Sequence, residues 1–342
     1  MIGSDEENCQ IEFVYRVALA REKEKARANT VKYSVRYAHL WVLLLAVFPL
    51  FFVAGPGYYS SRSFVAFWDL GHVFFFAVFS VWVTAIVPRR ALERPWRLLA
   101  VLFLVVLAAG CVVEGLQKFA TGRLPDPGDL LRNQLGCVTA FVWVFRAHFA
   151  QRRRLRLVQV VVVVLLLWAF WPLTRALTDE SLALRSFPVL SNFETPFERY
   201  RWKDPRQTRR ERNIVREGRF SMQVRLSTNK YSGTSLFYFP KDWRSYRRLH
   251  FSVYNPKNSP LELHCRIHDQ EHRKYGSAFS DRYNERFAVH HGWNDLVIDL
   301  DKVRKAPKGR MMDMERIQGF GLFVVNLPEP QSLYLDALYL SR

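Results

Sequence analysis

Cysteine is scarce in this sequence. Of 342 residues only four are cysteines, Cys9, Cys111, Cys137 and Cys265, and no two of them have the Cys-x-x-Cys spacing. Structural zinc sites and disulfide frameworks need cysteines at short or regular spacings. Neither kind of cross-link is therefore supported.

Acidic residues are also few relative to basic ones. The chain has 31 Asp and Glu against 50 Lys and Arg, which gives a formal net charge of +19. In a soluble protein such an excess suggests a nucleic-acid partner. Many of the cations, however, flank apolar runs at 89–97 and 152–156, where membrane proteins place cytoplasmic anchors. We therefore expect no nucleic-acid partner.

A signal-peptide pattern is missing at the N-terminus. The first apolar run follows a long charged stretch, 21–27, and no small-residue cleavage site comes after it. We expect the first apolar segment to stay in the mature protein.

Apolar runs are concentrated in one half of the chain, between 38 and 173. A helix needs about 20 apolar residues to cross a bilayer, and about 17 suffice when it is anchored. Five segments meet or approach this length. A single such segment could be a buried helix of a soluble protein, but five consecutive ones argue against that interpretation. The expected spans are 38–54, 67–87, 97–117, 130–147 and 157–173.

The distribution of Lys and Arg predicts the orientation of these spans. Cations are dense before the first span, between the second and third, and between the fourth and fifth. Cytoplasmic segments carry such an excess. The alternate connections, 55–66 and 118–128, are poor in cations and should face outward. We expect a multi-pass protein of the cell (inner) membrane, with the charged segment 1–37 in the cytoplasm and everything after the fifth span outside.

Polar residues cluster at the ends of three expected spans. The second opens with Asp69-Leu-Gly-His72, the third ends with Glu114-Gly-Leu-Gln117, and the fourth begins at Asp129 with Asn133 one turn later. Residues three or four apart project from one face of a helix. Because these ends all face outward in the predicted topology, we expect the three clusters to meet at the outer leaflet.

The combined pattern resembles the VanZ-like family, named for a protein linked to teicoplanin resistance. The resemblance covers about 38–148, and the expected membrane domain is 38–150. Two features depart from the family pattern: Leu70 and Gly71 replace the more usual Lys-containing pair, and the segment from Arg123 to Asp129 is rich in proline. The resemblance implies a ligand site made of Asp69, His72, Glu114, Gln117, Arg123, Asp129 and Asn133.

Three interpretations of this cluster remain open. It could bind a phosphate or sugar headgroup of a membrane lipid or lipid-linked glycan, with Arg123 as the bidentate donor. It could be catalytic, with Glu114 and His72 as general base and acid in a hydrolase or transferase. It could also simply hold three helices together through interhelical hydrogen bonds.

Beyond a fifth span and linker at 151–186, the sequence reads as short strands. Eight segments between 221 and 340 alternate apolar and polar residues and are separated by turn signals. This pattern is typical of an all-β sandwich, and about eight strands is the size of a jelly roll. We expect an extracytoplasmic β-sandwich over 187–342.

Several short sequence segments in 187–342 resemble those of carbohydrate-binding modules of the galactose-binding-like jelly-roll type. They include Asn192-Phe-Glu194, Asp242-Trp243, Gly292-Trp293-Asn294 and Tyr334-Leu-Asp336. In such modules an acidic residue near the start and one in the last strand often hold a structural calcium ion. The resemblance implies that Glu194 and Asp336 would be these ligands, although calcium takes about 6–8 oxygens.

A sugar site would need exposed aromatic rings beside planar polar groups. The polar stretch 268–286 is the best candidate for a binding loop, whereas core packing is an open alternative for Trp243. The candidate residues are Tyr231, Trp243, Asp269, His272, Arg273, Tyr275, Asp281 and Arg282. The partners that we expect are membrane lipids and a glycan or lipid-linked glycan. An alternative role is a scaffold for envelope assembly proteins.

Overall fold

The computed structural model describes residues 38–53, 55–121, 126–203 and 207–342. It divides into two compact units, a helical unit that includes Val65–Trp171 and a β-sheet unit of Gly57–Phe64 and Pro172–Arg342. The predicted cytoplasmic segment 1–37 and the predicted site residue Arg123 lie outside the described residues.

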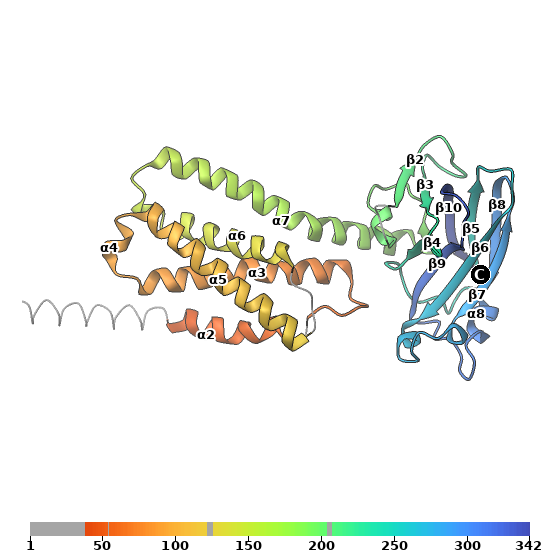
Figure 1. Cartoon of the computed structure of the whole chain (residues 1–342), viewed down its shortest axis with the longest axis horizontal. Coiled ribbons are helices and arrows are strands. Elements are labelled where there is room, and N and C mark those ends of the chain that lie inside the picture. The colour runs from red at the N-terminus through yellow and green to blue at the C-terminus, as the bar shows by residue number, and fades with distance from the viewer. Residues whose placement is uncertain (1–37, 54, 122–125, 204–206) are drawn as a thin grey trace, which may run out of the picture. The chain divides into compact units, whose positions relative to one another are not determined.

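Helices make up the N-terminal part of the chain (Figure 1). Their bounds are α2 Ala38–Val47, η1 Phe48–Phe51, α3 Arg62–Ile86, α4 Arg89–Leu92, α5 Pro95–Thr121, α6 Pro127–Val144, η2 Arg146–His148 and α7 Arg152–Ser186.

Three of these helices, α3, α5 and α7, are long and apolar enough to cross a membrane. The first expected span coincides with α2 and η1, which together form the shorter apolar segment Ala38–Phe51, and Pro49 is the second residue of the 3-10 turn that ends it. The fourth coincides with the 18-residue helix α6. A membrane location is therefore compatible with the structure, while the count of five spans stays a prediction.

The helical unit buries aromatic and branched side chains between its helices. Phe76 of α3, Val106 of α5 and Phe141 of α6 are almost completely covered. The outer helix surfaces are apolar as well, and only 6% of the apolar window of α7 is buried. Helices that stay apolar on their exposed faces are suited to a lipid environment.

Helix α7 is longer than the expected fifth span. Its 35 residues include Pro172 and continue to Ser186, so the linker expected after residue 173 is helical. At about 1.5 Å per residue such a helix is about 52 Å long, whereas a bilayer core is about 30 Å thick. Its C-terminal turns, from Pro172 onward, belong to the β-sheet unit.

The β-sheet unit is a sandwich of two antiparallel sheets (Figure 1). The first has the order β2-β3-β10-β5-β8, with β1 also paired to β10, and the second has the order β4-β9-β6-β7. The strands are β1 Val189–Ser191, β2 Thr208–Glu211, β3 Ser221–Leu226, β4 Tyr231–Leu236, β5 Arg248–Asn255, β6 Leu261–Asp269, β7 Tyr283–Val289, β8 Gly292–Asp299, β9 Ile317–Val325 and β10 Gln331–Ser341. The short helix α8, Leu300–Lys305, follows β8.

Alternation along the strands explains the sandwich. In β6 the residues from Leu261 to Ile267 at odd positions are buried, while Glu262, His264 and Arg266 point to the other face. Because successive strand residues project to opposite faces, this pattern builds a core on one side and an accessible surface on the other. The predicted all-β sandwich is confirmed, with two short strands, β1 and β2, in addition to the eight expected.

Candidate functional sites

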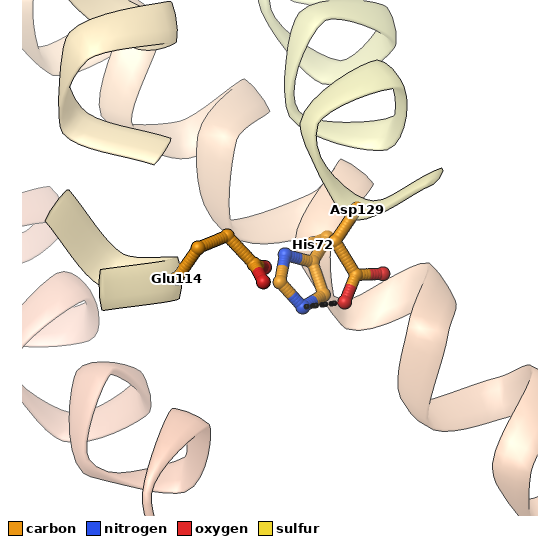
Figure 2. Close-up of side chains that lie close together, drawn as sticks. All are labelled: His72, Glu114 and Asp129. Atoms are coloured by element: carbon orange, nitrogen blue, oxygen red, sulfur yellow. Dashed lines mark ion pairs between the residues drawn. The ribbon is translucent and has the colours of Figure 1, made fainter. Parts of the chain in front are cut away.

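The first candidate site lies among three helices of the helical unit. One ring nitrogen of His72 and one carboxylate oxygen each of Glu114 and Asp129 lie within 4.8 Å of one another. Figure 2 shows the imidazole between the two carboxyl groups. We call these residues, with Gln117 and Asn133, the His72 cluster. All five are at most 6% exposed. The short distances between His72, Glu114 and Asp129 show that the structure brings together the helix ends that the sequence predicted to meet.

The protonation of His72 follows from its neighbours. Its Nδ1 lies 3.0 Å from Oδ1 of Asn133, and its Nε2 lies 3.4 Å from Oδ2 of Asp129. An amide oxygen only accepts hydrogen bonds, so this hydrogen bond requires the tautomer with the proton on Nδ1. The nitrogen that can exchange a proton or bind a cation is therefore Nε2, on the side of Asp129.

Arg132 supplies a cation that the sequence analysis did not place in the site. Its Nη1 lies 2.5 Å from Oδ1 of Asp129, and its Nη2 lies 3.3 Å from Oδ2 of Asp69. Asp69 therefore joins the edge of the cluster through this arginine. The spacing of three residues between Asp129 and Arg132 was the available signal, because i,i+3 neighbours share a helix face.

Glu114 and Gln117 of helix α5 also form hydrogen bonds to the backbone of two neighbouring segments. Oε2 of Glu114 accepts a hydrogen bond of 3.0 Å from the N–H of Asp126, and Nε2 of Gln117 donates one of 3.0 Å to the carbonyl of Phe51. Asp126 in turn caps α6 by accepting from the N–H of Gly128. The bonds of Glu114 and Asp126 fix the start of α6, and with it the position of Asp129, whereas the bond of Gln117 holds the end of η1 against α5.

Two glycines allow the helices to approach closely enough to form the cluster. A Cβ at Gly136 would lie 2.2 Å from the carbonyl oxygen of Val73, and one at Gly110 would lie 2.7 Å from Nδ2 of Asn133. Small residues at such crossings bring helix backbones together. The Asn133-x-x-Gly136 spacing thus places the hydrogen-bond partner of His72 and the contact with α3 on one face of α6.

The cluster can perform two kinds of chemistry. One nitrogen and two carboxylate oxygens at this spacing match the ligand types that divalent cations use. The same atoms form an acid and base pair, because Glu114 and Asp129 flank an imidazole that can give or take a proton at Nε2. Burial of these groups would strengthen either interaction.

The second candidate site is a cleft of about 1070 Å³ on the accessible face of the β4-β9-β6-β7 sheet. We call it the sheet cleft. Tyr231, which is 62% exposed, lies with its ring centre 6.0 Å from that of Phe323. Next to Phe323, the ring of His264 is stacked at 5.2 Å. Other lining residues are Lys203, Ser235, Arg266, Phe279, Arg282, Asn284, Glu285, Arg286, Lys302 and Lys308.

Only two of the predicted sugar-binding residues, Tyr231 and Arg282, line the sheet cleft. Trp243 is 0% exposed and donates from Nε1 to the carbonyl of Pro240 at 3.2 Å, so it is a core residue and offers no face to a sugar. Arg273 stacks over Tyr58, and Tyr275 is exposed beside Arg310. The missed residues, such as Phe323 and Arg266, occupy outward strand positions, and this alternation was the available signal.

The remaining predicted residues, Asp269, His272 and Asp281, form a buried network around Arg310. The guanidinium lies 2.6 Å from Oδ2 of Asp269 and 2.7 Å from Oδ1 of Asp281, and His272 Nδ1 lies 3.1 Å from Oδ2 of Asp281. These residues hold the segment between β6 and β7 in place.

Arg310 also determines the ionisation of the two aspartates. Its hydrogen bonds hold the pKa of Asp281 below the usual value. Burial would raise the pKa of Asp269, but the hydrogen bonds from Arg310 and from the Asp313 N–H outweigh it and lower that pKa. Both carboxyl groups are therefore ionised and engaged in structure.

Glu194 and Asp336, the predicted calcium ligands, accept hydrogen bonds from backbone. Oε1 of Glu194 accepts from the N–H groups of Arg219 and Phe220, at 2.7 and 3.1 Å. Oδ2 of Asp336 accepts from Arg216 and its neighbour, and Oδ1 accepts from Ala337. Calcium needs about 6–8 oxygen ligands, whereas N–H donors already point at these oxygens. The two carboxylates do not fit a calcium site and instead position the turn before β3.

No family model matches the chain, and no curated protein matches it. Among solved structures, a family 11 carbohydrate-binding module from Clostridium thermocellum, in complex with a β-1,3-1,4-mixed-linked tetrasaccharide, is 16% identical with a TM-score of 0.33, covering 45% of this chain and 94% of that one. A family 30 module of a cellulosomal cellulase from Clostridium thermocellum is 14% identical with a TM-score of 0.32, covering 40% and 82%. These values do not identify a family, and the resemblance to VanZ-like proteins finds no support in these comparisons.

Proposed function

We propose that this chain is an integral membrane protein that binds a cell-envelope glycan in the sheet cleft of its extracytoplasmic β-sandwich. The observation that carries the proposal is the pairing, on one accessible sheet face, of exposed aromatic rings with planar polar side chains. Aromatic faces pack against the apolar faces of sugar rings, and amide and guanidinium groups hydrogen-bond to hydroxyl groups. The apolar helices supply the membrane anchor.

Strand register supports this interpretation. Gly233 of β4, Phe323 of β9 and His264 of β6 are aligned across the sheet, and so are Ser235, Gly321 and Arg266 in the next outward row. A Cβ at Gly233 would lie 2.7 Å from Cβ of Phe323. The glycine therefore leaves the Phe323 ring space on the sheet surface, and the ring with Tyr231 forms a platform along one wall of the cleft.

A binding assay with matched aromatic variants tests the proposal. The full chain in detergent is screened against immobilised glycans, and Tyr231→Ala and Phe323→Ala are compared with Tyr275→Ala. The exposed fraction of Tyr275, 57%, is similar to that of Tyr231, 62%, but Tyr275 does not line the sheet cleft. We expect the first two variants to weaken binding about five- to thirtyfold, as loss of an aromatic contact of about 1–2 kcal/mol would, and the third to leave it unchanged. Glycan binding that is insensitive to Tyr231 and Phe323 would disprove the site.

A second candidate function is favoured by the His72 cluster. In this alternative, the helical unit is a hydrolase or transferase of a lipid-linked glycan, with Glu114 as general base and His72 as general acid. The buried approach of these groups within 4.8 Å supports it. Glu114→Gln should then abolish turnover of a lipid-linked glycan and preserve the thermal unfolding midpoint. If turnover persists in this variant, the cluster has only a binding or structural role.

The same helical cluster could instead bind the headgroup without reacting. Native mass spectrometry of the protein in mild detergent distinguishes these roles. A co-purifying glycolipid that is lost in His72→Ala would identify a headgroup site. A protein partner that co-purifies in the absence of any glycan would favour the scaffold role.

A further inference from the structure

The sheet cleft has an excess of positive charge. Its lining includes six basic side chains, Lys203, Arg266, Arg282, Arg286, Lys302 and Lys308, and one acidic side chain, Glu285. The single carboxylate already accepts a hydrogen bond from the hydroxyl of Tyr283. One of the six cations, Arg286, has an acidic neighbour outside the cleft lining: its Nη1 lies 3.5 Å from Oε1 of Glu262. The cleft thus presents a positive potential to any ligand that enters it.

Arg266 is the innermost of these cations. It projects from β6 beside Gly321 of β9, where a Cβ would lie 2.8 Å from its Nε. The absence of a side chain at this position lets the guanidinium lie against the sheet. Its Nη2 makes a long hydrogen bond of 3.4 Å to Oγ of Ser235, and its Nε is buried without a hydrogen-bond partner among the described residues.

Arg266 therefore has a buried donor, Nε, that no described residue satisfies. A guanidinium has five N–H donors, and leaving a buried donor unpaired is destabilising. Burial lowers the pKa of Arg266, because its charge is held in a partly desolvated place. A ligand with negatively charged oxygens would supply the missing acceptors.

Arg282 points to the same requirement. Its Nε donates to Oδ1 of Asn284 at 2.9 Å, and its guanidinium lies 5.3 Å from the ring centre of Phe279. Burial and then the neighbouring charge of Arg266 lower the pKa of Arg282. Two cations that line the same cleft are stabilised by an anion that binds both.

We propose that the sheet cleft is selective for an acidic glycan, whose carboxylate or phosphate groups pair with Arg266 and Arg282 while its sugar rings pack on Tyr231 and Phe323. This inference rests on the proposed glycan-binding function and adds the chemical class of the ligand. Arginine suits this role because its planar fork matches the two oxygens of a carboxylate or phosphate.

The test compares ligands that differ only in charge. Binding of the full chain in detergent is measured by isothermal titration calorimetry with polygalacturonate, with the fully methyl-esterified polymer, and with a neutral mixed-linked β-glucan. A phosphomannan distinguishes phosphate from carboxylate as the recognised group. We expect an acidic polymer to bind at least about tenfold more tightly than its neutral counterparts, the effect of one charge-assisted hydrogen-bonded pair.

Variants then locate the effect. Arg266→Gln and Arg282→Gln should each lower the affinity for the acidic polymer about tenfold, and should lower the affinity for the neutral glucan much less, because glutamine still hydrogen-bonds to hydroxyl groups but carries no charge. Arg244→Gln, an arginine outside the cleft that pairs with Asp242 and Glu315, should change neither. Arg282→Gln alone decides the question if Arg266→Gln shifts the thermal unfolding midpoint.

Each other outcome has a distinct meaning. Tyr231-dependent binding of the neutral glucan with no gain for the acidic polymer overturns this inference and leaves the proposed function standing. Binding of neither class overturns both. Equally tight binding of a single-stranded DNA oligonucleotide, without loss in Tyr231→Ala, would show a non-specific polyanion surface and overturn the inference.

Discussion

Asp179 of α7 and Arg201 of the 3-10 helix η3 (Glu198–Arg201) form a buried ion pair in which Nη2 and Nε of the arginine lie 2.8 and 3.0 Å from Oδ1 of the aspartate. Arg62, the first residue of α3, contacts the same carboxylate from another direction. Asp179 is 0% exposed. One carboxylate therefore joins the C-terminal part of α7 to two segments that are distant in the sequence.

Asp179→Asn should be strongly destabilising, because it leaves two arginines without their shared counter-charge. Removing one partner of a buried ion pair typically costs about 3–5 kcal/mol. We expect a clear drop in the thermal unfolding midpoint of the detergent-solubilised protein. Glu329→Gln, which breaks an exposed pair with Lys257, is the control and should have little effect. Equal midpoints for the two variants would contradict the structural role of Asp179.

Gly136→Ala should disturb the packing of α3 against α6. The new Cβ would lie 2.2 Å from the carbonyl oxygen of Val73, so the helices must separate, and overpacking of this kind costs about 1–3 kcal/mol. Gly115→Ala on α5 is a matched control, since a Cβ there meets nothing within 4 Å. Thermal unfolding of both variants checks this. A Gly136→Ala protein as stable as Gly115→Ala would refute the close approach.

Acid should weaken the segment between β6 and β7 through Arg310. The folded-state pKa values of Asp269 and Asp281 lie below the ordinary value of 3.8. The stability contributed by their ionised forms is therefore fully present above pH 3.8 and is lost as the pH falls below it. Arg310→Gln should be less stable at neutral pH and less sensitive to acid. Unfolding midpoints measured between pH 2 and pH 6 test this, and parallel curves for both proteins would argue against it.

Lys241 should make the free energy of unfolding depend on pH in the neutral to alkaline range. Burial lowers its pKa from 10.5 to about 7, while its ammonium group donates to the carbonyls of Phe237 and Gln318. Between these values the unfolded chain binds more protons than the folded chain, so the free energy of unfolding should rise with pH. Lys241→Met should flatten that rise. A rise that is unchanged in the variant would mean that another group titrates.

The sequence by itself determined the class of architecture. Apolar runs of 17 or more residues predict membrane-length helices because of bilayer thickness, and period-two alternation predicts the sandwich because strand residues alternate between faces. The eight strands from β3 to β10 therefore correspond to the eight expected segments. The short strands β1 and β2 were missed, because segments of three and four residues carry too little alternation to be recognised.

The grouping of Asp69, His72, Glu114 and Asp129 was also predictable, since the predicted topology places the ends of three expected spans at one level. Only the tertiary structure decided their partners: Arg132 lies against Asp129 and Asp69, and Gly136 permits the helix contact. The sugar-binding residues show the same division. Asp269, His272 and Asp281 have the composition of a binding loop, yet they surround Arg310, which lies 29 residues beyond Asp281 in the chain. A residue's type indicates which chemistry it can perform, whereas contacts between distant segments decide whether that chemistry serves a ligand or the fold.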